Sequence, residues 1–388
     1  MNSKNFILII KTQAGLEESL VTEVTEAGGR EVEPLIRTVK CKADNDVMYR
    51  INYTCRTALR VLKEVDEFEA DNEEAFYEGV KKFNWFDLLT VDQSFAVNAT
   101  VSNSAMTHSH YVALKTKDAI VDKFREKFNK RPNIDLGNPD LRIQVHIAGV
   151  RCTLLIDSSG DSLHKRGYRT RQGVAPINEV LAAGMVLLSG WDAKTDLLDP
   201  MCGSGTIVCE ANMIARKIPA GYFRKDYGFI KWKDFDGGLW KKIVENENSK
   251  IIPAKCKIYG SDVNQNAISL SHEILKNAGF ENDIDIKQVA FEDSSPPNVD
   301  GGFIIFNPPY GERIQKTDLF AFYKLIGDVL KSKYAGYEAW LISSDFGALK
   351  SVGLKTSRKI PLFNGPLECR FVKYELYKGS RKGISSGL

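Results

Sequence analysis

The fold is decided by a short turn between a predicted strand and a predicted helix, Asp199-Pro200-Met201-Cys202-Gly203-Ser204-Gly205-Thr206. The strand covers residues 196–199 and the helix covers residues 206–217. Glycines in such a turn let the backbone approach a ligand closely, and the first turn of a helix offers N–H groups to an anion. The turn lacks the lysine of a phosphate loop and the third glycine of a dinucleotide fingerprint. It therefore indicates a different ligand site, with an ordinary structural turn as the alternative.

Outward from this turn, strands and helices alternate along the chain. Further strands are predicted at residues 257–262, 284–289, 302–307 and 338–343, and helices at 178–188, 264–278 and 319–334. This alternation is typical of a doubly wound parallel sheet. Residues 359–377 form two predicted strands about Asn364-Gly365, which indicates an antiparallel hairpin at the edge of the sheet.

Two more motifs follow predicted strands. Asp262 ends the strand at 257–262, where an acid can bond ribose hydroxyls or cap the next helix, and both roles stay open. The tetrapeptide Asn307-Pro308-Pro309-Tyr310 follows the strand at 302–307 and must end it, since proline has no ladder N–H. An asparagine oxygen accepts hydrogen bonds and a tyrosine ring offers a stacking face. The motif therefore predicts a site for a planar base that carries an –NH2 group.

Residues 1–165 lack this regular alternation. Strands or short mixed segments are predicted at 6–10, 32–41, 47–51, 57–63, 95–101, 141–147 and 151–157, and helices at 16–27, 72–82 and 111–128. Such a mixture indicates an α+β region.

Composition excludes several classes of protein. The chain has 388 residues, 43% of them hydrophobic, with 53 basic and 50 acidic side chains, which is too apolar for a disordered chain and too long for a disulfide scaffold. Its longest apolar run near the N-terminus, residues 6–10, is too short for a signal peptide, and no stretch approaches the length of a membrane span. We expect a cytoplasmic protein with no membrane partner. The seven scattered cysteines and the lone His108/His110 pair predict reduced thiols and no metal site.

Taken together, the motifs resemble those of class I S-adenosylmethionine-dependent amino-methyltransferases. More closely, they are similar to the bacterial and archaeal RNA guanine-N2 methyltransferases that carry a THUMP domain, including the RlmL-like enzymes. The likeness extends to residues 13–17, 115–120, 163–169, 175–179 and 364–369, and thus to nearly the whole chain. It implies a ferredoxin-like segment at 1–60, a THUMP RNA-binding domain at 61–163 and a Rossmann-like methyltransferase domain at 164–388 with a C-terminal antiparallel hairpin.

The resemblance also implies roles for individual residues. The cofactor S-adenosylmethionine would be held by Asn178, Asp199, Met201, Cys202, Gly203, Gly205, Thr206, Asp262, Asp293 and Asn307. Among these, Asn178, Asp199 and the two glycines would line the methionine part, Asp262 the ribose and Asp293 the adenine. Met201 departs from the family pattern, where an aromatic residue is frequent. The target amine would be held by Asn307, Pro308, Pro309 and Tyr310, with no metal and no covalent nucleophile.

Contact with RNA is expected from a basic linker and from the end of the amine motif, namely from Lys165, Arg166, Tyr168, Arg169 and Arg313. Residues 222–233 alternate basic side chains with aromatic rings. That interleaving suits single-stranded RNA, through phosphate attraction and base stacking. A lid whose rings belong to a protein core is the alternative, and both stay open.

The resemblance implies methyl transfer to guanine N2 in RNA, with ribosomal RNA of the large subunit favoured and transfer RNA as the alternative. An adenine-N6 DNA methyltransferase would carry the same amine motif, but the RNA-binding-like N-terminal half disfavours DNA. A non-catalytic RNA-binding assembly factor is a third reading, which the intact cofactor and amine motifs disfavour.

Overall fold

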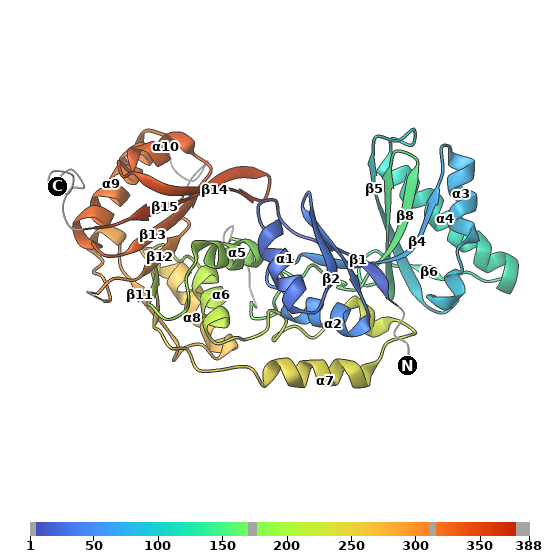
Figure 1. The fold of residues 1–388 in the computed structure, drawn as a ribbon, viewed down its shortest axis with the longest axis horizontal. Helices are drawn as coiled ribbons and strands as arrows, with labels where there is room; N and C mark the ends of the chain where they lie inside the picture. The colour runs from blue at the N-terminus through green and yellow to red at the C-terminus, as the bar shows by residue number, and fades with distance from the viewer. Residues whose placement is uncertain (1–4, 170–176, 299, 310–315, 378–388) are drawn as a thin grey trace. The chain divides into compact units, whose positions relative to one another are not determined.

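The computed structural model describes residues 5–169, 177–298, 300–309 and 316–377 (Figure 1). The chain divides into two compact units. The described residues within Met1–Thr12, Leu20–Leu163 and Lys225–Asn246 form the first, and those within Gln13–Ser19, His164–Arg224 and Glu247–Leu388 form the second.

The beginning of the chain forms a β-α-β-β-α-β motif. Its elements are β1 (Phe6–Lys11), α1 (Glu17–Glu26), β2 (Arg30–Leu35), β3 (Thr38–Ala43), α2 (Asn45–Thr54) and β4 (Arg60–Glu69). The strands pair antiparallel in the order β2-β3-β1-β4. This is the ferredoxin-like arrangement that the resemblance implied.

The long strand β4 joins this motif to the next part of the first unit. It pairs with β1 through residues 60–63 and with β8 through residues 62–69. The elements that follow β4 are α3 (Glu73–Lys82), η1 (Trp85–Asp87), β5 (Ser94–Ser102), α4 (Ser109–Phe128), β6 (Asn133–Ile134), β7 (Leu141–Ala148) and β8 (Arg151–Asp157). Within the described residues one eight-stranded sheet results, in the order β2-β3-β1-β4-β8-β7-β5-β6.

The strand-like prediction for residues 47–51 is wrong, because this segment lies in α2. The Asp44 side chain caps the helix by accepting a hydrogen bond of 3.1 Å from the Val47 N–H. Val47, Met48 and Ile51 are buried at helical spacing. A short apolar run is compatible with the residue spacing of a strand or of a helix, and the Asp44 cap favours the helix here.

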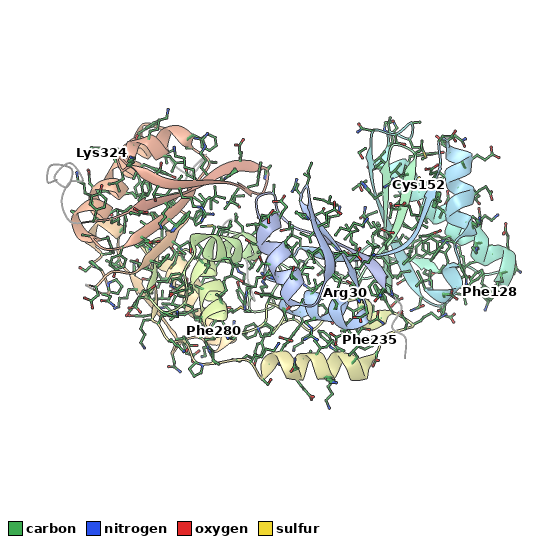
Figure 2. The ribbon with its side chains drawn as sticks, in the orientation of Figure 1. Arg30, Phe128, Cys152, Phe235, Phe280 and Lys324 are labelled. Carbon is green, nitrogen blue, oxygen red and sulfur yellow. The ribbon has the colours of Figure 1, made fainter. Side chains whose placement is uncertain are left out.

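The segment between Lys225 and Asn246 adds aromatic side chains to the core of the first unit. Tyr227, Phe229 and Trp232 are buried there, and the Tyr227 and Phe229 rings stack with centroids 5.2 Å apart. Phe235, labelled in Figure 2, packs edge-on against Tyr49 at 6.0 Å. Of the two readings of residues 222–233, the RNA-stacking one is therefore wrong for the three buried rings, because a buried ring cannot stack on a base. The same region contains η2 (Gly228–Lys231) and α7 (Gly237–Asn248), two elements that the sequence pattern did not predict.

The second unit contains the predicted parallel sheet. Its strands are β9 (Leu197–Asp199), β10 (Ile258–Asp262), β11 (Ile284–Gln288), β12 (Phe303–Phe306), β13 (Glu338–Ser343), β14 (Thr356–Asn364) and β15 (Leu367–Glu375). Their order is β11-β10-β9-β12-β13-β15-β14. The first five are parallel, and β15 runs antiparallel to both β13 and β14. The doubly wound fold and the hairpin about Asn364 and Gly365 are both confirmed.

Helices cover both faces of this sheet. They are α5 (Glu179–Ser189), α6 (Thr206–Ala215), α8 (Gln265–Ala278), α9 (Lys316–Lys333) and α10 (Phe346–Ser351), with a 3-10 turn η3 (Phe291–Asp293). Figure 1 shows α9 and α10 on one side and α5, α6 and α8 on the other. Ile304 and Phe306 of β12 belong to the same core as Tyr323 and Ile326 of α9. No helix in the described parts of the chain is long and apolar enough to span a membrane.

Candidate active site

The carboxyl ends of three neighbouring strands bring the predicted site residues to one edge of the sheet. Strand β9 lies between β10 and β12, so the order of strands reverses there. Asp199 ends β9, Asp262 ends β10, and Asn307 follows β12 directly. Ligands of doubly wound folds bind at such a switch point, outside the carboxyl ends of the strands.

The glycine turn after β9 is held from the adjacent strand and helix. The Gly203 N–H donates to Asp262 Oδ2 at 2.9 Å, and Ser271 Oγ donates to the Gly203 carbonyl at 2.7 Å. Gly203 and Gly205 have φ angles of 54° and 80°, in the left-handed region that favours glycine. A Cβ on Gly203 would meet no atom of the described residues within 4 Å, so this backbone borders open space. The turn thus offers a cradle that a ligand can approach.

Asp262 is not the N-cap of the helix that follows it. That cap is Asn264, whose side chain accepts hydrogen bonds from the Asn266 and Ala267 N–H groups. Asp262 instead accepts from the Asn264 N–H through Oδ1 and from Gly203 through Oδ2, both at 2.9 Å. Its carboxylate therefore ties the glycine turn to the end of β10, and a role toward ribose stays a prediction.

Asp199 is a buried acid whose ionised form a nearby cation would stabilise. It is 1% exposed, and its Oδ1 accepts one hydrogen bond of 3.1 Å from the Met201 N–H. Burial raises the pKa of Asp199 well above its ordinary value, and the negative charge of Asp262 adds to this. The α-ammonium group of S-adenosylmethionine carries the charge that such a site lacks, so the residues present fit this cofactor.

Burial disfavours the reactive, ionised form of the Cys202 thiol in the same turn. Burial and the nearby carboxylates of Asp199 and Asp262 raise its pKa well above that of a solvated cysteine. The thiolate is the reactive form, so this position provides no nucleophile.

Asn307 carries an unmatched acceptor. Its Oδ1 is buried and has no hydrogen-bond partner among the described residues. Pro308, which follows it, is buried, and Pro309 is half-buried. Buried polar atoms without a partner are rare and call for an explanation. Tyr310 and Arg313 of the same motif lie outside the described residues.

Four other predicted cofactor residues have defined local environments. Asn178 is the N-cap of α5 and accepts a hydrogen bond of 2.9 Å from the Val180 N–H. Thr206 is the first residue of α6 and is buried, whereas Met201 is half-buried against the core under α9. Asp293 ends η3, just after β11, and is exposed. The contacts of these residues with a cofactor stay predictions.

The linker residues predicted to contact RNA prove to be largely buried. Arg166 and Tyr168 are each 2% exposed and converge on Glu210 of α6. Arg166 Nε lies 3.4 Å from Glu210 Oε1, and the Tyr168 hydroxyl donates to the same oxygen at 3.0 Å. The prediction of RNA contact is wrong for both, because their side chains are buried. A run of basic residues in a linker stays exposed only where no acidic side chain of the protein interior pairs with it.

Arg169 is also withdrawn from the surface, with its side chain 11% exposed and paired with Glu179. This pairing disfavours its predicted contact with RNA, which stays a prediction. Lys165 is exposed and remains a candidate for RNA contact.

Sequence reasoning missed the two acids that pair with these arginines. Glu210 is fully buried in α6, and Glu179 is 7% exposed at the start of α5. A signal was present, since each is the single acid of a helix made otherwise of apolar, small and uncharged polar residues. A lone acid in such a helix indicates a buried ion pair. Within the described residues, no group of three or more histidine, cysteine, aspartate or glutamate side chains is arranged to hold a metal ion.

Three family models match the chain. The model of the RMKL-like methyltransferase domain matches residues 166–373, the THUMP domain model matches residues 70–157, and the RlmL ferredoxin-like domain model matches residues 7–62. The first of these contains every described residue of the predicted cofactor and amine sites, and Lys165 lies just before it.

Among curated proteins, a Synechocystis sp. protein with the provisional name of an RNA methyltransferase is 37% identical over 365 residues, which cover 94% of this chain and 95% of that protein. The ribosomal RNA large subunit methyltransferase K/L of Shewanella frigidimarina is 34% identical, over 95% of this chain but 52% of that protein. The chain thus spans about half the length of the K/L relatives.

Solved structures match over the whole fold. The structure of SMU.472, provisionally described as a methyltransferase and complexed with SAH, has a TM-score of 0.87 at 27% identity and covers 98% of this chain and 100% of that one. A protein from Listeria monocytogenes, described as a predicted N6-adenine-specific DNA methylase, has a TM-score of 0.86 at 28% identity and covers 96% and 97% of the two chains.

Proposed function

This chain belongs to the RMKL-like methyltransferase family, and we propose that it transfers a methyl group from S-adenosylmethionine to the exocyclic N2 amine of a guanine in RNA. Ribosomal RNA of the large subunit is the proposed substrate. The names of the K/L relatives and the match to the THUMP model support this choice. A ribosomal substrate in turn supports a cytoplasmic location.

One observation carries the proposal: the buried Oδ1 of Asn307 has no partner among the described residues, at the carboxyl end of β12. A substrate –NH2 group supplies the donor that this oxygen lacks. The carbonyl of Pro308, the next residue, is a second acceptor in the same loop. Two acceptors can take both N–H bonds of one amine and leave its lone pair for reaction.

The chemistry of the amine explains why such acceptors help. An exocyclic base amine is a poor nucleophile, because its lone pair is spread into the ring. S-adenosylmethionine, when bound, supplies an electrophilic methyl group on sulfur. Asn307 and Pro308 favour a more tetrahedral nitrogen, and acceptors that fit this state better than the flat amine lower the barrier. Holding the two reactants in line provides a large share of the acceleration.

The residues at the glycine turn would hold the cofactor. The buried Asp199 would face its ammonium group, and Asp262 would accept hydrogen bonds from its ribose hydroxyls. Gly203 and Gly205 would let it lie against the backbone of the turn. Asn178 and Asp293 remain candidates for the methionine and adenine parts.

A guanine in a duplex cannot reach this loop, so the target base must be extruded or single-stranded. Capture of the RNA is proposed for the first unit, where the end of α4 carries exposed cations beside aromatic rings. Lys127 Nζ lies 4.1 Å from the centroid of the Phe86 ring, and Phe128, labelled in Figure 2, is 45% exposed. Lys130 and Arg131 follow and are exposed. Phosphate attraction next to stacking faces suits RNA.

Two other substrates keep the chemistry. Adenine N6 in DNA is favoured by the name of the Listeria protein and by the amine motif itself, which would serve either base. Transfer RNA would use the same RNA-binding module. Neither alternative changes the roles proposed for Asn307 and Asp262.

Mass spectrometry of nucleosides tests the substrate. We expect a strain without this gene to lose N2-methylguanosine from large-subunit ribosomal RNA and to regain it with the wild-type gene. Loss from transfer RNA, or loss of N6-methyladenine from DNA, would contradict the ribosomal proposal. Titration of the purified chain with S-adenosylmethionine tests the cofactor separately, and no detectable binding would contradict a methyltransferase function.

A further inference from the structure

The linker segment that enters the second unit places one arginine between two helices of that unit. Arg169 Nε lies 2.9 Å from Glu179 Oε1, in the first turn of α5. The other end of its guanidinium donates a hydrogen bond to the Thr206 hydroxyl, in the first turn of α6. Helices α5 and α6 pack against each other, so this side chain bridges their N-terminal ends.

This position is unfavourable for a cation on its own. The N-terminus of a helix carries partial positive charge, and Arg169 meets two such ends. The α6 terminus has no side-chain cap, since its N-cap is Gly205 in the left-handed conformation. Only the charge of Glu179 offsets this repulsion among the contacts described for Arg169.

The partners of the pair depend on each other because both are withdrawn from water. The side chains of Arg169 and Glu179 are 11% and 9% exposed. Burial raises the pKa of Glu179, and Arg169 is the largest influence acting in the opposite direction. Loss of Arg169 would therefore leave Glu179 as a buried acid without this cation. The charge of the nearby Glu210 raises the pKa of Glu179 further.

The bridged helix ends adjoin two parts of the proposed cofactor site. Asn178 is the N-cap of α5, and the turn containing Gly203 and Gly205 leads into α6. We propose that Arg169 is a positioning residue for S-adenosylmethionine, which fixes the spacing between Asn178 and the glycine turn by tying together the first turns of α5 and α6. This inference rests on the proposed function of the site.

The alternative is the role expected from the sequence, in which Arg169 binds an RNA phosphate. The two roles separate in experiment. A phosphate ligand that is lost lowers RNA affinity and the salt dependence of RNA binding. A positioning residue that is lost lowers cofactor affinity and leaves the binding of RNA as it was.

The experiment measures binding of S-adenosylmethionine to the full chain by calorimetry, for wild type, Arg169→Met and Arg169→Lys. We expect affinity to fall about tenfold or more in Arg169→Met, since a small displacement of positioning groups is costly. Arg169→Lys keeps the charge but lacks the planar fork that reaches two partners, so we expect most of the loss there too. The affinity of both variants for RNA should stay within about twofold of the wild-type value, whereas loss of a phosphate contact would lower it.

The matched control is Arg216→Met. Arg216 is the C-cap of the same helix α6, and its Nη1 lies 2.5 Å from Asp283 Oδ2. It loses an ion pair at the opposite end of α6, so a general loss of stability would appear in both variants. Unchanged cofactor affinity in Arg169→Met, or an equal loss in Arg216→Met, would overturn the proposal.

Two further variants keep the test decisive if Arg169→Met folds poorly. Thr206→Val removes one of the two contacts and leaves the ion pair, and Glu179→Gln weakens the other contact. Each substitution should lower cofactor affinity. The double variant should lose less affinity than the product of the two separate fold-losses, because both substitutions act through Arg169. Fully independent losses would contradict the bridge. Absence of cofactor binding in the wild type would instead contradict the proposed function.

Discussion

Two asparagines, one in each unit, differ in what surrounds their side chains. Asn52 of α2 is 1% exposed and fully matched: its Nδ2 donates to the Met48 carbonyl and to Ser158 Oγ, both at 2.9 Å, and its Oδ1 accepts from Ser159 Oγ at 2.7 Å. Asn307 after β12 has a buried Oδ1 with no partner among the described residues.

The difference separates a polar group that builds the fold from one kept for a ligand. A matched buried amide contributes to stability through each of its hydrogen bonds, whereas an unmatched acceptor costs about 1–3 kcal/mol. A fold retains such a cost where a bound molecule supplies the missing donor. Asn52 should therefore matter for folding and Asn307 for catalysis, and the predictions below test this division.

The largest effect is expected at Asn307. Asn307→Ala should slow single-turnover methyl transfer by about 10²–10³-fold, the usual loss for an aligned polar group at a developing charge. The free energy of unfolding should change little, because no protein partner among the described residues is lost. A fall in affinity for S-adenosylmethionine would support the second role predicted for Asn307, toward the cofactor. Transfer at the wild-type rate would mean that the loop only ends a strand.

Asn52→Ala should have the opposite profile. It removes three buried hydrogen bonds, those with the Met48 carbonyl and with the Ser158 and Ser159 hydroxyls, although each hydroxyl keeps a hydrogen bond with the Val61 backbone. We expect a loss of about 2–3 kcal/mol in the free energy of unfolding by urea. Under conditions where this variant is folded, its cofactor affinity should equal that of the wild type. A stability loss below about 0.5 kcal/mol, the range of neutral surface changes, would remove the contrast with Asn307.

Asp262 should show a smaller effect on cofactor binding. Asp262→Ala should weaken S-adenosylmethionine binding by about 1.5–3 kcal/mol, the range for a charged hydrogen-bond partner. Asn264→Ala is the matched control, since it removes the cap of α8 at a cost of about 1 kcal/mol in stability. Equal cofactor affinity in Asp262→Ala and Asn264→Ala would reject Asp262 as the ribose ligand.

The smallest effect concerns pH. The raised pKa of Asp199 means that its carboxyl keeps a proton to higher pH than a solvated aspartate does. A bound ammonium group favours the ionised form, so cofactor affinity should fall as pH falls through this pKa, by at most about tenfold per pH unit. Calorimetry in buffers of different ionisation enthalpy should detect release of up to one proton on binding.

Asp199→Asn sharpens this test. An amide does not ionise, so the pH dependence of cofactor affinity due to this position should disappear. A folded-state pKa raised above the unfolded value costs stability once the pH exceeds the unfolded value, so the variant should also be more stable than the wild type at neutral pH without cofactor. An unchanged pH profile would assign the titration to another group.

Much of the second unit could be predicted because its signals are local. A strand that ends in Asp199 and a helix that begins at Thr206 are separated by glycines with positive φ, and nearby residues determine such a turn. Asn307-Pro308-Pro309 ends β12 because proline cannot continue a ladder. Parallel strands then bring these turns to one edge of the sheet.

The basic linker shows what local signals do not determine. Arg166 and Arg169 form a charge run in the sequence, yet their side chains pair with Glu210 and Glu179. The partner of Arg166 lies 44 residues away along the chain, so nothing in the neighbourhood of the arginine distinguishes a buried ion pair from a solvated cation. The rings at 227, 229 and 232 pose the same problem, since burial depends on a core to which distant segments contribute.

The sequence by itself therefore predicted the strand, turn and helix around the glycine turn, the amine motif and the family resemblance, because backbone conformation and turn chemistry depend on adjacent residues. Only the tertiary structure shows which charges are paired, which rings belong to the core and which buried oxygens, that of Asn307 among them, lack a donor among the described residues. Burial and hydrogen bonding depend on the positions of groups far apart in the chain, and folding brings those groups together.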